Sequence, residues 1–288
     1  MKNDSLKKIF LIIISIAFTF SCESNDSIAN NVDKQILKKI TSGVNGQYLV
    51  HFNDNGLHSL TESTRFSNPI KISELIYNSD KLINRKSYSN SGTLMASSDY
   101  FYDNENNINS IKVIIYGLPD NEYVINLSYQ DNTITGYTFE NQSGKHKVVF
   151  TFTDSEYSKL ERYEVYNSNN NIKLFEEVFS YSVNNNLIDS TILVGEDNTR
   201  SPNIYSYDNQ KNPYTESNKK YFLHSIINPV SFGSLKGSLA IWSPNNLNTL
   251  VNGEGRVELE YDNKDYPTKE TSYNDSDEII NIRTFEYY

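Results

Sequence analysis

The sequence predicts an all-β protein: a curled or partly closed antiparallel β-meander built from repeated hairpins, with one irregular excursion near residues 209–253. Three observations predict it. The 288 residues include 22 Tyr and 14 Phe, and such aromatic residues favour strands. Clusters of Asn, Asp and Ser follow many of these aromatics, as turns require. Between the turns, apolar and polar residues alternate, as in "RVELEYD" from Arg256.

The N-terminus has the pattern of a secretory signal. "MKNDSLKK" is basic, and an apolar run from Ile9 to Phe20 follows it. That run is too short to span a bilayer as a helix, so we expect residues 1–21 to be a cleaved signal peptide. "SC" comes next, and Cys22 is the only cysteine of the chain. No disulfide can therefore form within the chain, and the hydrophobic core must suffice.

A single cysteine directly after the apolar run resembles a bacterial lipoprotein signal. In that family the cysteine is acylated and becomes the mature N-terminus, although Thr19 stands here where the family usually has Leu. The resemblance implies that Cys22 is lipidated and that the membrane is a partner through this anchor. The alternative is an ordinary cleaved signal with an incidental cysteine near the cut.

The rest of the chain is predicted to form a tether and one domain. Residues 22–33 are small and polar and follow the cysteine as a tether. Residues 34–288 are predicted to form a single repeat-built β domain. Its first segment, "KQILKKI", fits a short helix or a first strand equally well.

The repeated unit is an aromatic residue, two to six turn-type residues, and then an aliphatic residue, with many spacings near 25 residues. The pattern predicts a hairpin in which the aromatic ends one strand and the aliphatic starts the next. These aromatics either pair across strands, which is the favoured interpretation, or stack on a sugar or protein ligand. They are Phe52, Tyr77, Tyr102, Tyr129, Tyr166, Tyr181, Tyr207, Tyr261 and Tyr273.

The excursion breaks this pattern. Residues 209–253 contain the only tryptophan and several prolines, and they are predicted to be irregular or to form short helical pieces. A departure of this length either covers the open end of the sheet, which we favour, or carries function.

The C-terminal repeats resemble a known group. "YDNQKNPY", "ELEYDNKDYPTKETSY" and "RTFEYY" are similar to the tyrosine-aspartate (YD, or RHS-like) repeats of bacterial surface proteins, with Asp265 in place of a typical glycine. Their order over residues 35–288 resembles flavobacterial-type lipoproteins of unknown function from Bacteroidetes. The resemblance implies a curled antiparallel sheet and a lipid anchor, and it implies no activity.

Two shorter resemblances concern export and modification. Glu23 and Asp26 follow Cys22, as acidic residues do in surface-exported Bacteroidetes lipoproteins. We therefore expect an outer-membrane lipoprotein, with the cell surface favoured over the periplasmic face. "DSI" and "DST" resemble O-glycosylation sites of that group, which puts forward Ser27 and Ser190.

Motifs for chemistry are scarce in this sequence. His51 and His58 flank the first turn, but a metal site needs three or four convergent ligands, so we predict neither a metal nor a cofactor. The Asp and Asn clusters fit turns better than a calcium loop. Glu176 and Glu177 are adjacent on a strand and point to opposite faces, so they cannot act as a glycosidase pair. The net charge of −10 disfavours nucleic acid as a partner.

These observations predict a non-catalytic binding or structural module of the envelope, with a glycan or a protein as the possible ligand. Two alternatives stay open. One is a carboxylate-dependent envelope glycan hydrolase, which needs a close, buried carboxylate pair in a cleft. The other is a periplasmic immunity or inhibitor lipoprotein that binds a basic protein.

Overall fold

Aromatic and β-branched residues form strands in almost every described part of the chain. The structure, a computed structural model, describes residues 35–65, 68–117, 121–138, 146–194, 198–199, 203–214, 243–248 and 255–288. The predicted signal peptide, the predicted tether and most of residues 209–253 lie outside these residues. The strands are β1 Leu37–Ser42, β2 Tyr48–Phe52, β3 His58–Ser63, β4 Ile70–Asn78, β5 Lys81–Tyr88, β6 Leu94–Tyr102, β7 Ile108–Ile115, β8 Glu122–Gln130, β9 Thr133–Thr138, β10 His146–Phe152, β11 Leu160–Asn167, β12 Lys173–Tyr181, β13 Leu187–Val194, β14 Asn198–Thr199, β15 Asn203–Ile204, β16 Tyr207–Lys211, β17 Asn245–Leu247, β18 Arg256–Tyr261, β19 Pro267–Tyr273 and β20 Ile279–Tyr287.

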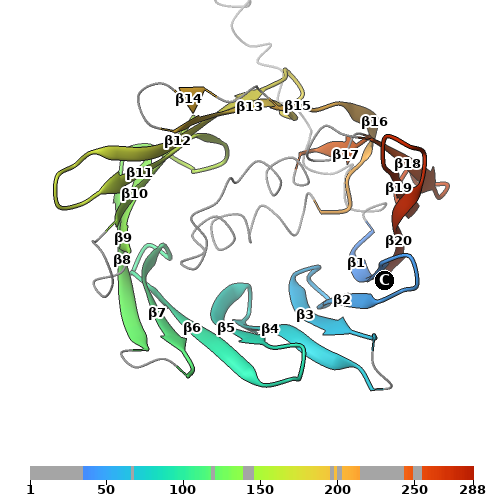
Figure 1. The fold of residues 1–288 in the computed structure, drawn as a ribbon, viewed down its shortest axis with the longest axis horizontal. Helices are drawn as coiled ribbons and strands as arrows, with labels where there is room; N and C mark the ends of the chain where they lie inside the picture. Colours follow the sequence, from blue (N-terminus) through green and yellow to red (C-terminus); the bar gives the residue numbers. More distant parts are fainter. Residues whose placement is uncertain are drawn as a thin grey trace, which may run out of the picture. The chain divides into compact units, whose positions relative to one another are not determined.

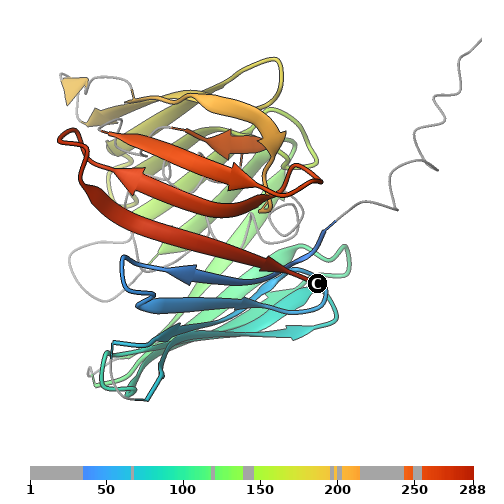
Figure 2. The ribbon, with the colours of Figure 1, turned by 90° about the vertical axis from the view of Figure 1, so that its right-hand side faces the viewer.

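One antiparallel sheet contains every described strand except β16 and β17. Strands β1 to β13 pair in chain order, each with the next. The C-terminal strands join at the other side, because β20 pairs with β1, and β19 and β18 follow outward. Figure 2 shows β20 beside β1. The sequence prediction of an all-β, curled meander is confirmed, and within the described residues the sheet does not close on itself.

Asx chemistry builds the hairpin turns. In the turn after β6, the Asp103 carboxylate accepts hydrogen bonds from the backbone N–H groups of Glu105 (2.9 Å) and Asn107 (2.8 Å). Asn106, the fourth residue of this turn, has a φ of 69°, and the register of β6 and β7 shifts beside it. This is the arrangement of a type I turn followed by a left-handed residue and a bulge. The same pattern begins at Asn53, Ser89, Asp262 and Asn274.

Strand alternation directs one set of side chains into the core. Along β7, Ile111 and Val113 are fully buried, and the two partners of Ile111, Tyr100 on β6 and Ile125 on β8, are buried as well. This cluster continues through the strands up to β13. A second cluster of Leu37, Ile40, Phe52 and Phe285 joins the first strands to β20.

The first segment is a strand, which settles its ambiguity. Leu37 and Ile40 are both buried, and their three-residue spacing is the feature that also fits a helix. A register shift between Leu37 and Lys39 turns both side chains to the same face. Pairing with β2 on one edge and β20 on the other then decides for the strand, because both sets of backbone groups are satisfied.

The described parts of the excursion, residues 209–214 and 243–248, contain strands as well. β16 and β17 form a separate two-stranded sheet, which Figure 1 shows between β15 and β18. The predicted helical pieces fall on residues outside the described part of the chain. Among the residues that the structure describes, there is no helix of the length and apolarity that a membrane span requires.

Candidate functional site

Four repeat tyrosines bind the backbone of the preceding hairpin. Each lies at or near the end of its strand, and its hydroxyl donates to a carbonyl at the start of an earlier return strand. The donor and acceptor lie 19 to 21 residues apart in sequence. The pairs are Tyr77 with His58 (2.8 Å), Tyr102 with Leu82 (2.8 Å), Tyr129 with Ile108 (2.9 Å) and Tyr181 with Leu160 (2.7 Å).

Burial fixes the protonation state of these tyrosines. It raises the pKa of Tyr102, Tyr129 and Tyr181 above the ordinary value, since a phenolate would lose its hydration. Their hydroxyls therefore remain protonated and donate the bonds described. These hydroxyls are therefore used within the scaffold, whereas pairing of the aromatic rings across strands stays a prediction.

The other repeat aromatics have different partners. Phe52 lies in the core, and the Tyr207 hydroxyl accepts a hydrogen bond from Ser243 (3.1 Å). The Tyr261 hydroxyl donates to Asp208. Tyr166 and Tyr273 donate to Glu164 (2.8 Å) and Glu258 (2.9 Å), and the Arg256 guanidinium lies 3.8 Å from the centre of the Tyr273 ring.

Sequence reasoning missed a further member of the tyrosine series. The Tyr287 hydroxyl donates to the Pro267 carbonyl at 2.7 Å, 20 residues earlier in the sequence. No turn cluster follows Tyr287, so a search for an aromatic before a turn does not find it. The recurring separation of about twenty residues from the start of a return strand is the signal that identifies it.

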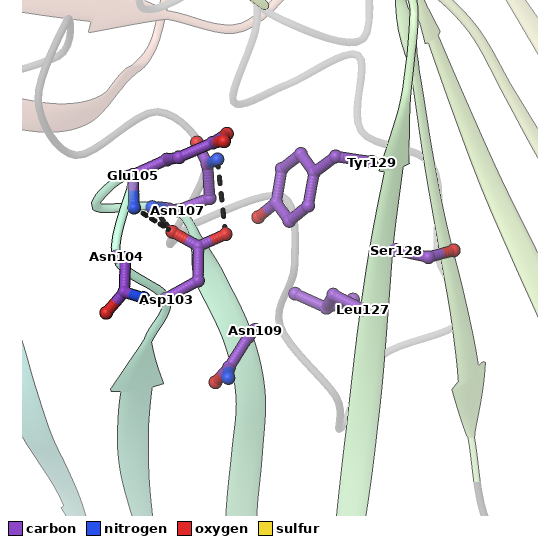
Figure 3. A pocket seen from close by; sticks show the side chains of 8 residues that line it. All are labelled: Asp103, Asn104, Glu105, Asn107, Asn109, Leu127, Ser128 and Tyr129. Carbon is purple, nitrogen blue, oxygen red and sulfur yellow. Dashed lines mark hydrogen bonds between the residues drawn. The ribbon is translucent and has the colours of Figure 1, made fainter.

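The described residues also form a pocket of about 390 Å³ at the β6–β7 turn. The turn and the start of β7 contribute polar side chains, and β8 contributes Leu127, Ser128 and Tyr129. Figure 3 shows the Tyr129 ring facing the turn across this pocket. The polar lining residues are Asp103, Asn104, Glu105, Asn107 and Asn109.

Most of the fixed polar atoms in the pocket serve the turn itself. One Asp103 oxygen accepts two backbone N–H groups, and the other accepts the Asn107 amide at 3.3 Å. Asn104 and Glu105 are exposed. The Tyr129 ring is held by its hydroxyl bond and by an edge-to-face contact with Tyr157, whose centroid is 5.4 Å away. The pocket therefore offers a fixed ring beside free amide and carboxylate groups.

Carboxylates elsewhere have the arrangement that the sequence predicts. Glu177 is 0% exposed, whereas Glu176, on the other face of β12, forms ion pairs with Arg162 (3.3 Å) and Lys173 (2.8 Å). In the pocket, Glu105 is exposed and Asp103 is bound by backbone N–H groups. Glu164 lies opposite Glu176 and shares the Lys173 ammonium with it (2.9 Å), and neither residue lines the pocket. The pocket itself therefore lacks the pair of close, buried carboxylates that acid–base hydrolysis requires.

The two histidines near the first turn bind different partners. The register places His51 opposite Leu60 and His58 opposite Phe52. The His51 ring lies 3.0 Å from Glu62, and the His58 ring lies 2.8 Å from the Thr61 hydroxyl. His58 is more buried than a surface histidine, and this burial, with Arg85, lowers its pKa to about 4. In the described ranges no group of three or more His, Cys, Asp or Glu side chains is placed to hold a metal ion.

The predicted modification sites fall in different places. Cys22 and Ser27 lie outside the described residues. Ser190 lies in β13 and is 0% exposed, so a glycan on this hydroxyl would have to be attached before the chain folds.

The comparisons with known proteins give weak structural similarity. No protein-family model matches the chain, and no curated protein matches it significantly. Among solved structures, a porin-like protein from Bacteroides uniformis aligns with a TM-score of 0.42 and 10% identity, covering 88% of this chain and 98% of that one. A porin-like protein from Bacteroides vulgatus aligns with a TM-score of 0.33 and 11% identity, covering 88% and 99%.

Proposed function

We propose that this chain is a non-catalytic binding module of the bacterial cell envelope, anchored in the outer membrane through a lipid on Cys22, and that its ligand is a glycan. The pocket between the β6–β7 turn and β8 is the binding site. The observation that carries this proposal is the combination of a fixed Tyr129 ring with the side chains of Asn104, Glu105 and Asn109 around one cavity.

The residues that line the pocket are of the types that bind sugars. The C–H face of a sugar ring packs on an aromatic ring, and its hydroxyls bind amides and carboxylates. The volume of about 390 Å³ falls in the range of about 300–1,000 Å³ that small-molecule sites occupy. Asn104 and Glu105 are exposed, so they can turn toward a ligand without disturbing the hairpin. Asn109 is exposed as well, and because its Oδ1 accepts a hydrogen bond from the Ser110 hydroxyl (3.3 Å), its amide NH₂ is the group that can donate to a ligand.

The proposal is non-catalytic because of how the carboxylates are used. Asp103 is committed to the turn by two backbone N–H groups, and Glu105 stands in solvent. A glycosidase needs one carboxyl group with a raised pKa, and burial is the usual cause. The hydroxyls of Tyr102 and Tyr129 bind carbonyls of the scaffold, so the proposal uses only the ring face of Tyr129 for the glycan.

The anchor and the lineage are part of the same proposal. A basic and apolar N-terminus that ends at Cys22 supports lipidation, and the YD-like repeats support a Bacteroidetes lipoprotein. The C22S variant tests the anchor, since it should lose fatty-acid labelling and leave the membrane fraction. Protease treatment of intact cells tests the orientation: digestion places the protein on the surface, and protection until the outer membrane is broken places it on the periplasmic face.

Binding is tested with a panel of soluble glycans and the full chain, by calorimetry. The Asn104→Ala and Glu105→Ala variants should each weaken the bound glycan about tenfold, the effect of one lost hydrogen bond to a ligand. Asn184→Ala is the matched control, because Asn184 is an exposed turn residue outside the pocket. Failure of every glycan to bind, or equal affinity of all variants, would overturn the glycan proposal.

The same samples separate binding from hydrolysis. We expect each bound glycan to be recovered intact, without new reducing ends, after prolonged incubation. Release of reducing ends that depends on Glu105 or Asp103 would favour the hydrolase alternative. A tight complex with one basic protein, in the absence of glycan binding, would favour the immunity alternative.

A further inference from the structure

The small sheet β16–β17 joins the two ends of the meander (Figure 1). On one side, the Tyr205 N–H donates to the Ile188 carbonyl of β13 at 3.1 Å. On the other side, the Val257 N–H of β18 donates to the Asn248 carbonyl at 3.1 Å. We call residues 205–212 and 243–248 the seam. This seam links strands that no ladder connects in the described part of the chain.

Backbone pairing inside the seam is irregular. β16 and β17 are in register only at Tyr207–Leu247 and Lys211–Asn245, with a shift between them. In contrast, β6 and β7 stay in register without a break from Ala96–Ile115 to Phe101–Ser110. A continuous ladder forms and breaks cooperatively, whereas isolated bonds break one at a time.

Hydrogen bonds of asparagine side chains link the seam strands to the β12–β13 turn and to each other. Asn245 and Asn186 exchange two hydrogen bonds, from the Asn186 amide to Asn245 Oδ1 at 2.9 Å and from the Asn245 N–H to Asn186 Oδ1 at 3.0 Å. The Asn245 amide also donates to the Gln210 carbonyl at 2.9 Å. Nearby, the Ser243 hydroxyl accepts the Leu187 N–H at 2.9 Å. Asn186 and Ser243 are 6% and 3% exposed, so these bonds are inside the protein.

The free energy of opening differs between the contacts of residues 243–248 and the ladder around β7. Opening the ladder at Ile111 and Ile125 exposes apolar surface to water, which is unfavourable. Moving residues 243–248 away exposes Ser243, Asn245 and Asn246, whose hydrogen bonds water replaces, together with the partly buried Leu247. Tyr205 and Tyr207 of the seam pack in the core and stay in place. We therefore expect the contacts of residues 243–248 to open at a lower free energy than the β6–β7 ladder.

We propose that the domain opens at this seam as a built-in conformational device. Residues 243–248 leave the β12–β13 turn and the β18 edge, while the meander from β1 to β13 stays paired. Opening frees backbone groups on β13 and β18, and it leaves the pocket beside Tyr129 unchanged. The device stands independently of the proposed glycan function.

Hydrogen exchange of the full chain, read by mass spectrometry, tests this proposal. The amides of Asn212, Asn248 and Val257 each donate a backbone bond that involves residues 243–248, and they should exchange at least about tenfold faster than the paired amides of β6 and β7. Equal protection in the seam and in the β6–β7 ladder would overturn it, since the sheet would then open as one unit.

A variant sharpens the test. Asn245→Ala removes the amide bonds to Asn186 and Gln210, so exchange in the seam should rise about another tenfold while β6–β7 exchange stays constant. Asn184→Ala, an exposed residue of the neighbouring turn, should change neither. An equal rise throughout the domain in Asn245→Ala contradicts local opening. The comparison in the natural chain decides the proposal even where this variant does not fold.

Discussion

The hydroxyl of Tyr102 donates a hydrogen bond of 2.8 Å to the backbone carbonyl of Leu82, which lies near the start of the strand that precedes its own. The same relationship joins Tyr181 to Leu160 at 2.7 Å and Tyr287 to Pro267 at 2.7 Å. Each hairpin is thereby fastened to the one before it at the turn end, where strand pairing stops. The recurring tyrosine hydroxyl is an element of the scaffold, and at Tyr129 the ring of the same residue also lines the proposed glycan pocket.

Replacement of Asp265 by glycine should stabilise the domain. Asp265 has a φ of 68°, a left-handed conformation that costs energy in residues with a Cβ atom and little in glycine. We expect Asp265→Gly to raise the free energy of unfolding by about 0.5–1 kcal/mol, measured by urea denaturation.

Asp277 is the matched control for this change. Its φ is 60°, but its carboxylate accepts a hydrogen bond from Arg256 at 3.1 Å. Asp277→Gly removes this bond together with the strain, so its gain should be smaller. An Asp265→Gly variant no more stable than the natural chain would show that the aspartate carries no strain.

Introduction of a methyl group at Gly136 should destabilise the sheet. A Cβ atom on this residue would lie 2.9 Å from Leu127 Cδ2 and 3.2 Å from Val148 Cγ2, which is too close. We expect Gly136→Ala to lower the free energy of unfolding by about 1–3 kcal/mol through overpacking. The double variant with Leu127→Ala should lose less than the two single losses added together, because the clash is removed. If the two losses of unfolding free energy add exactly, the destabilisation by Gly136→Ala does not come from a clash with Leu127.

His58 should make stability depend on pH. Burial and Arg85 lower its pKa in the folded state to about 4, below the unfolded value of about 6.5. Between these values the unfolded chain binds the proton and the folded chain does not, so stability falls as pH decreases from about 6.5 to 4. The loss is at most about 3 kcal/mol, at about 1.4 kcal/mol per pKa unit.

The His58→Gln variant isolates this effect. The unfolding free energy of the natural chain minus that of the variant should decrease as pH falls through that window. Urea denaturation at fixed ionic strength measures both values. A difference that stays constant from pH 7 to pH 4 would mean that His58 titrates alike in both states.

The hairpins could be predicted because their chemistry is local. Asp103, Asn106 and the alternating residues of β7 lie within a few positions of one another, and turn geometry depends on residues at that distance. The adjacent Glu176 and Glu177 likewise point to opposite faces because alternation is local.

Contacts between residues far apart in the chain could not be predicted from the sequence. The pairing of β1 with β20 joins opposite ends of the domain, and the Asn186–Asn245 exchange joins side chains 59 residues apart. The pocket was also missed as a site, since Tyr129 meets the β6–β7 turn through sheet geometry that no spacing encodes. The sequence identified Tyr129 as a turn aromatic and the Asp and Asn residues as turn formers, but it did not show that they share a pocket.

The claim that the repeat tyrosines form the scaffold is tested most directly by unfolding measurements on tyrosine-to-phenylalanine variants. Tyr102→Phe and Tyr181→Phe should each lower the free energy of unfolding by about 1 kcal/mol, because a buried carbonyl loses its donor. Tyr137→Phe, at an exposed position, should leave it unchanged, and none of the three should alter glycan affinity. Unchanged stability in the first two variants, together with weakened ligand binding, would contradict the account and return these tyrosines to a recognition role.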